Sequence, residues 1–164
     1  MKKSNVILIG MPGVGKSTVG VVLAKLLGYH FIDTDLVIQE KEGRLLKEII
    51  ADEGNAGFLK IEEKVNAELE AEHCVIAPGG SVVYGENAMR HFKEIGTVVY
   101  LKASYEMINE RLSNLEGVVL KEGQTLKDLY DERCVLYEKY ADVVIDEHGR
   151  SLADTAKAVE IAVR

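Results

Sequence analysis

Residues Gly10 to Thr18 read "GMPGVGKST", and this stretch decides the fold. A short apolar run, "NVILI", precedes it, and a helical pattern, "STVGVVLAKLLG", overlaps its end. The spacing G-x-x-x-x-G-K-S matches the Walker A pattern, in which a glycine-rich loop between a strand and a helix turns backbone N–H groups toward a phosphate. The positive dipole end of the helix that begins near Lys16 favours the same anion. We therefore predict nucleotide binding here; the alternative is a plain glycine-rich turn.

The side chains of this loop suit ATP and magnesium. Lys16 would place a cation on the β- and γ-phosphates, and the Ser17 hydroxyl would ligate Mg²⁺. The residues that we predict to bind ATP through the loop are Gly13, Val14, Gly15, Lys16, Ser17 and Thr18.

Length and charge limit the other classes of function. The chain has 164 residues, which predicts one domain over 1–164. Its net charge of −7 argues against a general nucleic-acid binder and against an electrostatic membrane anchor. The first apolar run is too short for a signal peptide, and no stretch approaches the ~20 apolar residues of a membrane span. Cys74 and Cys134 have no metal-site spacing, so we interpret them as thiols in a cytoplasmic protein.

Short β-rich runs alternate with longer helical patterns along the chain. Near-continuous apolar runs are typical of strands buried on both faces of a parallel sheet, and the alternation predicts an α/β sandwich with right-handed crossovers. Ligands in such sheets bind at the carboxyl ends of the strands, where several polar or glycine-rich spots fall. The predicted strands are 5–10, 30–35, 74–80, 97–101 and 142–146, and the predicted helices are 16–27, 58–72, 104–114, 125–140 and 152–163.

Asp33 and Asp35 end the second predicted strand, "HFIDTD". Two residues apart on an extended chain, their carboxylates would point the same way. One would hold Mg²⁺ through water, and the other would orient or deprotonate an acceptor hydroxyl. The alternative is a polar strand end whose aspartate caps the next helix, "LVIQEKEG".

At this point the chain resembles shikimate kinase, a small member of the nucleoside-monophosphate-kinase-like P-loop enzymes. The resemblance rests on "GMPGVGKST", "DTD" from Asp33, "GFLKIEEKV" from Gly57, "PGG" from Pro78 and "ERCVLYEKYADVVID" from Glu132. It implies a three-layer α/β sandwich with a five-stranded parallel sheet, a substrate-binding region near 33–62 and a small lid near 113–124. It also implies a monomer that transfers the γ-phosphoryl group of ATP, with Mg²⁺, to a ring hydroxyl of shikimate.

The resemblance assigns roles to individual residues. Lys16 would contact the phosphates, Ser17 would bind Mg²⁺ and Asp33 would hold the metal through water. Asp35 would grip the substrate hydroxyls and act as the base. The further substrate-binding residues would be Glu62, Gly79, Gly80 and Arg133, with Arg133 on the substrate carboxylate. Arg111 would lie over the adenine as a cation–π contact; the alternative is a surface charge that pairs with nearby glutamates.

Three departures from the family pattern concern the acceptor half of the site. Leu59 occupies the position of the arginine in the family's FRxxE motif, and a leucine cannot donate to a carboxylate. Lys60 is adjacent but points about 100° away on a helix. Ser113 to Gln124 hold no lid arginine; Lys121 is the obvious substitute, and the alternative for it is a solvated lysine in a charged loop. The family's three consecutive glycines are reduced to Gly79 and Gly80.

These departures leave three hypotheses. The first is an ATP-dependent kinase of this family with shikimate as the acceptor. The second is a relative that phosphorylates another small hydroxy acid, amino acid or polyol, bound through one arginine. The third is a nucleotide-binding protein with little transfer activity.

Overall fold

The computed structural model describes residues 3–112 and 123–164. It has the predicted α/β architecture, with helices and strands alternating along the chain. The strands are β1 (Asn5–Ile9), β2 (His30–Asp33), β3 (Cys74–Ala77), β4 (Gly96–Lys102) and β5 (Val143–Asp146). The helices are α1 (Lys16–Leu27), α2 (Thr34–Glu42), α3 (Leu46–Ala67), the 3₁₀ helix η1 (Gly80–Tyr84), α4 (Glu86–Ile95), α5 (Tyr105–Arg111), α6 (Leu126–Tyr140) and α7 (Leu152–Val163).

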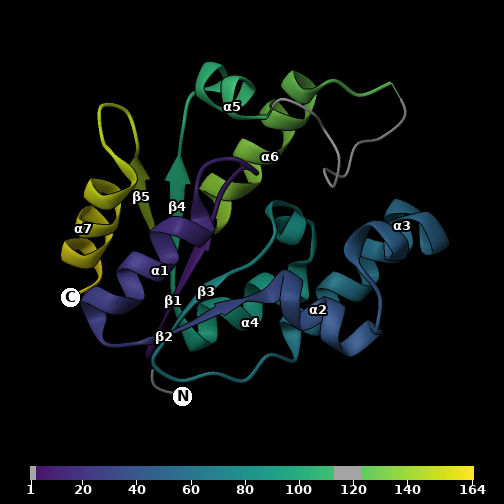
Figure 1. The fold of residues 1–164 in the computed structure, drawn as a ribbon, viewed down its shortest axis with the longest axis horizontal. Helices are drawn as coiled ribbons and strands as arrows, with labels where there is room; N and C mark the ends of the chain where they lie inside the picture. Colours follow the sequence, from purple (N-terminus) through teal and green to yellow (C-terminus); the bar gives the residue numbers. More distant parts are fainter. Residues whose placement is uncertain (1–2, 113–122) are drawn as a thin grey trace.

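The five strands form one parallel sheet in the order β2-β3-β1-β4-β5. Helices α1 and α7 pack against each other on one side of the sheet, while α4 and α6 lie on the other (Figure 1). This confirms the three-layer prediction. Because β1 lies at the centre and all strands run the same way, the loop after β1 opens at the carboxyl edge of the sheet, beside the ends of β3 and β4.

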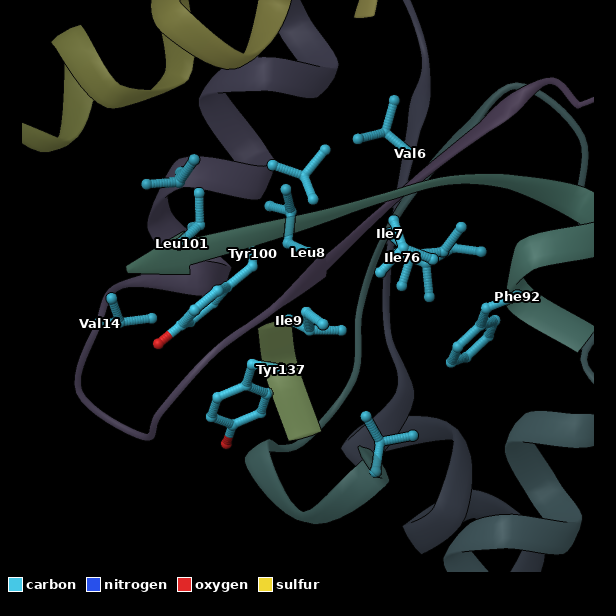
Figure 2. Close-up of a cluster of buried hydrophobic side chains, with 14 of the residues drawn as sticks. Val6, Ile7, Leu8, Ile9, Val14, Ile76, Phe92, Tyr100, Leu101 and Tyr137 are labelled. Atoms are coloured by element: carbon cyan, nitrogen blue, oxygen red, sulfur yellow. The ribbon is translucent and has the colours of Figure 1, made fainter. Parts of the chain in front are cut away.

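The core is built from β-branched and aromatic side chains of the central strands. β1 is buried along its whole length, as predicted for a strand covered on both faces. Figure 2 shows Leu8 and Ile9 of β1 close to Tyr100 of β4 and Tyr137 of α6. The two tyrosine rings lie 5.2 Å apart between centroids. This packing fixes α6 against the sheet, so that residues on α6 can face the loop after β1.

The observed ends of the second and third strands differ from the predicted ends, and both lie next to the candidate site. The second strand ends at Asp33 rather than at residue 35, because Asp33 caps α2 and Asp35 is already helical. The third strand ends at Ala77 rather than at residue 80, and Gly80 begins η1. The segments after β2 and β3 therefore turn as they leave the sheet, which places polar groups above the carboxyl edge of the sheet.

The observed helices differ more from the predicted helices than the observed strands differ from the predicted strands. Helix α3 begins at Leu46, twelve residues before the predicted start, and carries a kink at Gly54, where φ is 73°. Helix α4 was not predicted, although Ala88, Met89, Phe92 and Ile95 have helical spacing and are all buried. α3 packs on α4, on α2 and on η1, and a second small cluster of Ile38, Ile49, Phe58 and Val65 holds it.

Over residues 3–112 and 123–164, none of the helices combines the length and apolar character that crossing a bilayer requires.

Candidate active site

The phosphate loop runs from the end of β1 to the start of α1. Gly15 is the N-cap of α1 and has φ 94°, a left-handed conformation that favours glycine. A Cβ at this position would also come within 2.8 Å of the Leu152 side chain, so the site admits only glycine without adjustment. The loop is tightened by a hydrogen bond from the Val14 N–H to the Met11 carbonyl, 3.2 Å long. These constraints aim the N-terminal N–H groups of α1 at the space above the sheet.

Lys16 lies over its own loop. Its ammonium group donates to the carbonyls of Gly10 and Met11, at 2.7 and 2.9 Å. Burial lowers the pKa of Lys16 to about 8, and the nearby Asp35 carboxylate opposes this shift. The lysine is therefore charged at neutral pH and held at the mouth of the loop, where it can neutralise a phosphate.

Ser17 and Thr18, in the first turn of α1, are exposed and line the same cavity as Lys16. Asp33 lines that cavity too, so a hydroxyl and a carboxylate share one wall. In the described parts of the chain, no group of three or more His, Cys, Asp or Glu side chains could hold a metal ion. The donor set fits Mg²⁺, because this ion commonly takes one or two protein oxygens and completes its shell with water and phosphate oxygens.

The two aspartates have different environments. Asp33 Oδ1 accepts from the Asp35 N–H at 2.9 Å, so Asp33 is the helix cap that the alternative reading predicted. The carboxylates are not arranged along an extended strand, as the sequence suggested, yet both line the cavity. Burial, and to a smaller extent the charge of Asp33, raise the pKa of Asp35 to about 6, against the opposing effect of Lys16. Asp35 is therefore mostly ionised at neutral pH and basic enough to take a hydroxyl proton.

The cavity has a volume of about 340 Å³ and joins the phosphate loop to the acceptor-side elements. Gly79 and Gly80, after β3, form part of its wall. A Cβ on Gly80 would lie 2.9 Å from the Pro12 ring and 3.0 Å from Arg133 Nη1, so the absence of a side chain lets the guanidinium and the phosphate loop approach each other. The lining residues are Pro12, Gly13, Gly15, Lys16, Ser17, Thr18, Asp33, Asp35, Leu46, Phe58, Glu62, Ala77, Pro78, Gly79, Gly80, Ser81 and Arg133.

Arg133, on α6, is 1% exposed and reaches the cavity wall. Its guanidinium lies 5.4 Å from the centre of the Tyr84 ring, which is cation–π distance. One helical turn further along α6, the Tyr137 hydroxyl donates to the Gly80 carbonyl at 2.7 Å and ties the helix to η1. Among the described residues that line the cavity, Lys16 and Arg133 carry the positive charges.

Glu62, on α3, is also almost completely buried, at 2% exposure. Its Oε1 accepts from the Ser81 hydroxyl at 2.7 Å. Burial raises the pKa of Glu62 to about 8; the Ser81 hydrogen bond and Arg133 oppose the shift, and Asp35 adds to it. The Glu62 side chain is consequently mostly a neutral carboxylic acid at neutral pH.

Arg111, at the end of α5, lies beside the phosphate loop rather than in the cavity wall. Its guanidinium donates to the Gly13 carbonyl at 3.0 Å and pairs with Glu147 at 3.4 Å. Glu147 follows β5 and is 1% exposed, and burial raises its pKa. Arg111 therefore pairs with a glutamate, as the alternative prediction stated. This glutamate is buried and comes from a distant part of the sequence, not from the surface near Arg111. Contact with adenine stays a prediction.

Of the three departures from the family pattern, the glycine pair lines the cavity, Leu59 lies outside its lining, and most of the lid lies outside the described residues. Leu59 packs against the small cluster of Ile38, Ile49, Phe58 and Val65, while Leu46, Phe58 and Glu62 form the α3 part of the cavity wall. Lys60 is exposed and lines a separate surface hollow with Glu63 and Asn87, so its position does not compensate for Leu59. Most of the predicted lid at 113–124, with Lys121, lies outside the described residues.

Sequence reasoning missed Ser81 and Glu147. Ser81 directly follows the glycine pair, so its place next to a functional motif was the available signal. Glu147 follows the last strand, at the edge where ligands bind in such sheets, but nothing in the sequence pairs it with Arg111.

Comparison with known proteins supports one family over nearly the whole chain. The family described as shikimate kinase matches residues 12–162. A shikimate kinase of Thiobacillus denitrificans is 36% identical over 163 residues, which cover 96% of this chain and 89% of that protein. One from Paracidovorax citrulli is 40% identical over 154 residues, covering 89% and 84%.

Solved structures agree with the sequence comparison. A shikimate kinase from Acinetobacter baumannii in complex with shikimate superposes with a TM-score of 0.87 at 32% identity, covering 95% of this chain and 90% of that one. The Aquifex aeolicus shikimate kinase gives a TM-score of 0.83 at 31% identity, covering 96% and 95%. The cavity combines a phosphate loop, an aspartate of raised pKa and a buried arginine. Together with these comparisons, this shows that the chain belongs to the shikimate kinase family.

Proposed function

We propose that this chain is an ATP-dependent phosphotransferase that moves the γ-phosphoryl group of ATP to a hydroxyl of a small molecule, with shikimate as the acceptor. The observation that carries the proposal is the single cavity in which Lys16 and the start of α1 face Asp35 and Arg133. A phosphate site and a base share one space, as in-line transfer to an alcohol requires.

The proposed mechanism assigns one task to each group. The N-terminal N–H groups of α1 and the ammonium of Lys16 stabilise negative charge on the transferring phosphoryl group. Asp35 accepts the proton of the acceptor hydroxyl, and Arg133 pairs with the acceptor carboxylate. Ser17 and Asp33 would hold Mg²⁺, which neutralises phosphate charge when bound. Gly13, Val14, Gly15 and Thr18 would surround the phosphates, and Arg111 would contact the base.

A second acceptor class is favoured by one observation. Leu59 packs in an apolar cluster, and Arg133 is the arginine among the described lining residues. An arginine that binds the acceptor carboxylate through two hydrogen bonds contributes several kcal/mol at most to the binding free energy, because each charged hydrogen bond is worth roughly 1.5–3 kcal/mol. Leu59 cannot make this contribution. An acceptor bound through one arginine, such as another hydroxy acid or a polyol, is therefore the second candidate.

The test is ATP turnover by the purified protein with Mg²⁺, with and without millimolar shikimate, in a coupled ADP assay. A shikimate-dependent rate in the common kinase range of about 1–100 s⁻¹ supports shikimate as the acceptor. ATP binding without stimulation by shikimate supports the second class, and a panel of small alcohols then identifies it. ATP binding with no stimulation by any alcohol supports a nucleotide-binding protein.

We further propose that the protein acts as a monomer in the cytoplasm.

A further inference from the structure

A buried carboxyl group on the acceptor side has a serine as its partner. Glu62 Oε1 accepts from the Ser81 hydroxyl at 2.7 Å, and both side chains are buried, at 2% and 6% exposure. The second oxygen, Glu62 Oε2, is buried and has no hydrogen-bond partner among the described residues. A buried polar atom without a partner costs free energy, about 1–3 kcal/mol, so such an atom at a cavity wall indicates a ligand contact.

Glu62 Oε2 and Asp35 Oδ1 converge on one point. A Cβ built on Gly79 would lie 3.2 Å from Glu62 Oε2 and 3.0 Å from Asp35 Oδ1. All three residues line the cavity. The two carboxyl oxygens therefore flank the bare backbone of Gly79, from α3 on one side and from α2 on the other.

We propose that Ser81 is a positioning residue for the acceptor: its hydroxyl holds Glu62 Oε1 and so leaves Oε2 to bind, together with Asp35, a hydroxyl group of the acceptor above Gly79. This inference rests on the proposed function, because it takes the acceptor to be an alcohol in the same cavity.

The hydrogen-bond directions complement an alcohol. Ser81 donates to Oε1, so Oε1 acts as an acceptor and the carboxyl proton sits on Oε2. Burial raises the pKa of Glu62 to about 8, which keeps this proton in place at neutral pH, while Asp35 Oδ1 offers an acceptor oxygen beside it. The pair thus offers one donor and one acceptor, and a hydroxyl group can both accept from Glu62 and donate to Asp35.

The charged groups around Glu62 set the direction of the pH dependence. Asp35 on α2 and Arg133 on α6 face it, η1 contributes the Ser81 hydroxyl, and Lys16 on α1 lies beyond Asp35. Ionisation of Glu62 above pH 8 would remove the donor and add a negative charge beside Asp35. The KM for the acceptor should therefore rise above about pH 8. Since the Ser81 hydrogen bond lowers the pKa of Glu62, its loss should move that rise to higher pH.

Three variants of the full chain test the inference. Ser81→Ala should raise the KM for shikimate roughly three- to tenfold at neutral pH and leave the KM for ATP within about twofold, since one hydrogen bond is lost on the acceptor side. In Glu62→Gln the alkaline rise in KM should disappear, because the amide oxygen still accepts from Ser81 while the amide nitrogen donates and does not titrate. Ser4→Ala is the matched control, since Ser4 Oγ accepts a hydrogen bond from the His73 N–H at 3.2 Å, before β1 at the opposite edge of the sheet.

A second readout does not need turnover. The Glu62 carboxyl can be titrated in the free protein by carbon-13 NMR, with Glu62→Gln identifying its signal. Ser81→Ala should raise the measured pKa of Glu62, and Ser4→Ala should leave it unchanged. Kinetics are run at saturating ATP and the KM for the acceptor is determined separately from kcat, because Lys16 titrates in the same range and acts on ATP binding and on kcat.

The outcomes separate the inference from the proposed function. If wild-type protein turns over shikimate but Ser81→Ala keeps both the wild-type KM and the wild-type Glu62 titration, the inference is wrong and the function stands. If wild type does not turn over shikimate, the choice of acceptor is wrong, and the titration decides the inference: an unchanged Glu62 pKa in Ser81→Ala overturns it, and an upward shift supports it. An alkaline rise in KM that persists in Glu62→Gln would contradict the neutral-donor role of Glu62.

Discussion

The ammonium group of Lys16 is held by two backbone carbonyls of its own loop, at 2.7 and 2.9 Å. Lys16→Ala should lower kcat for phosphoryl transfer by at least about 10²-fold, because a charge aimed at the transferring group is lost. Thermal unfolding should show a folded protein, since the hydrogen bonds of the side chain within residues 3–112 and 123–164 go to carbonyls of its own loop. The coupled ADP assay measures the loss.

Lys25→Ala is the control for this experiment, because Lys25 is an exposed lysine in the last turn of the same helix. It should keep the wild-type rate. Full activity in Lys16→Ala would contradict the phosphate-loop mechanism.

Asp35 makes the pH dependence of the reaction predictable. Its pKa is raised to about 6, chiefly by burial, and a general base must be deprotonated to act. The value of kcat/KM should therefore fall as pH drops below about 6. Asp35→Asn should lower kcat by about 10²–10⁴-fold and remove this acid limb. A wild-type acid limb at the ordinary aspartate value would contradict the raised pKa of Asp35, and an acid limb that persists in Asp35→Asn would show that the base is another group.

At the residue scale, a residue's place in the cavity was predictable where a motif marks it. Lys16 and Ser17 are defined by the spacing of the phosphate loop, and Asp33 and Asp35 by their place at a strand end. Glu147 was not predictable as the partner of Arg111, because the two residues are 36 positions apart in sequence and meet only when β4 and β5 pair.

Helix α3 places Leu59 three residues before Glu62, and side chains at that spacing are neighbours on a helix. Leu59→Arg should therefore bring a guanidinium next to Glu62 and the cavity, and lower the KM for shikimate at least several-fold. The pKa of Glu62 should fall, because a nearby positive charge favours the carboxylate. Steady-state kinetics measure the KM, and thermal unfolding measures the cost of removing Leu59 from its apolar cluster.

The matched control is Lys60→Arg, which puts the same guanidinium on the exposed side of α3. It should leave the KM for shikimate unchanged. An unchanged or raised KM in Leu59→Arg, with the fold intact, would indicate a cavity built for another acceptor.

At the element scale, the sequence was a better guide to strands than to helix ends. Near-continuous apolar runs marked the five strands; β1 and β3 are buried along their whole length, whereas the edge strands β2 and β5 are partly exposed. The early start of α3 was missed because Gly54 interrupts the pattern: its φ of 73° breaks the helical geometry while the chain continues as a helix on both sides. Such a kink depends on how the two halves pack against α2 and α4.

The whole molecule should lose stability as pH rises toward 8, because it buries a carboxyl group. The pKa of Glu62 is about 8 in the folded state against an ordinary value of 4.5, so the unfolded chain ionises first. The contribution of Glu62 to the free energy of unfolding is complete below about pH 4.5 and is lost as pH rises through about 8. The total loss is on the order of a few kcal/mol. Asp35 acts in the same direction up to about pH 6.

Glu62→Gln should flatten this dependence, since the amide does not titrate. Urea unfolding at a series of pH values from 5 to 8 measures the slope in both proteins. The effect of Lys16 has the opposite sign and begins near pH 8, where the folded state loses its proton before the unfolded state does. A wild-type stability that is flat over this range would show that Glu62 is ionised in the folded protein.

The sequence by itself determined the phosphate loop, the α/β class and the family. Each depends on local spacing: glycines that permit one turn, apolar runs that must be buried, and a lysine at a helix start. The arrangement of the acceptor side depends on tertiary packing, which brings Asp35, Glu62, Ser81 and Arg133 together from four separate elements, α2, α3, η1 and α6. Their protonation and pairing depend on burial and on mutual distance, which arise when those elements pack over the edge of the sheet.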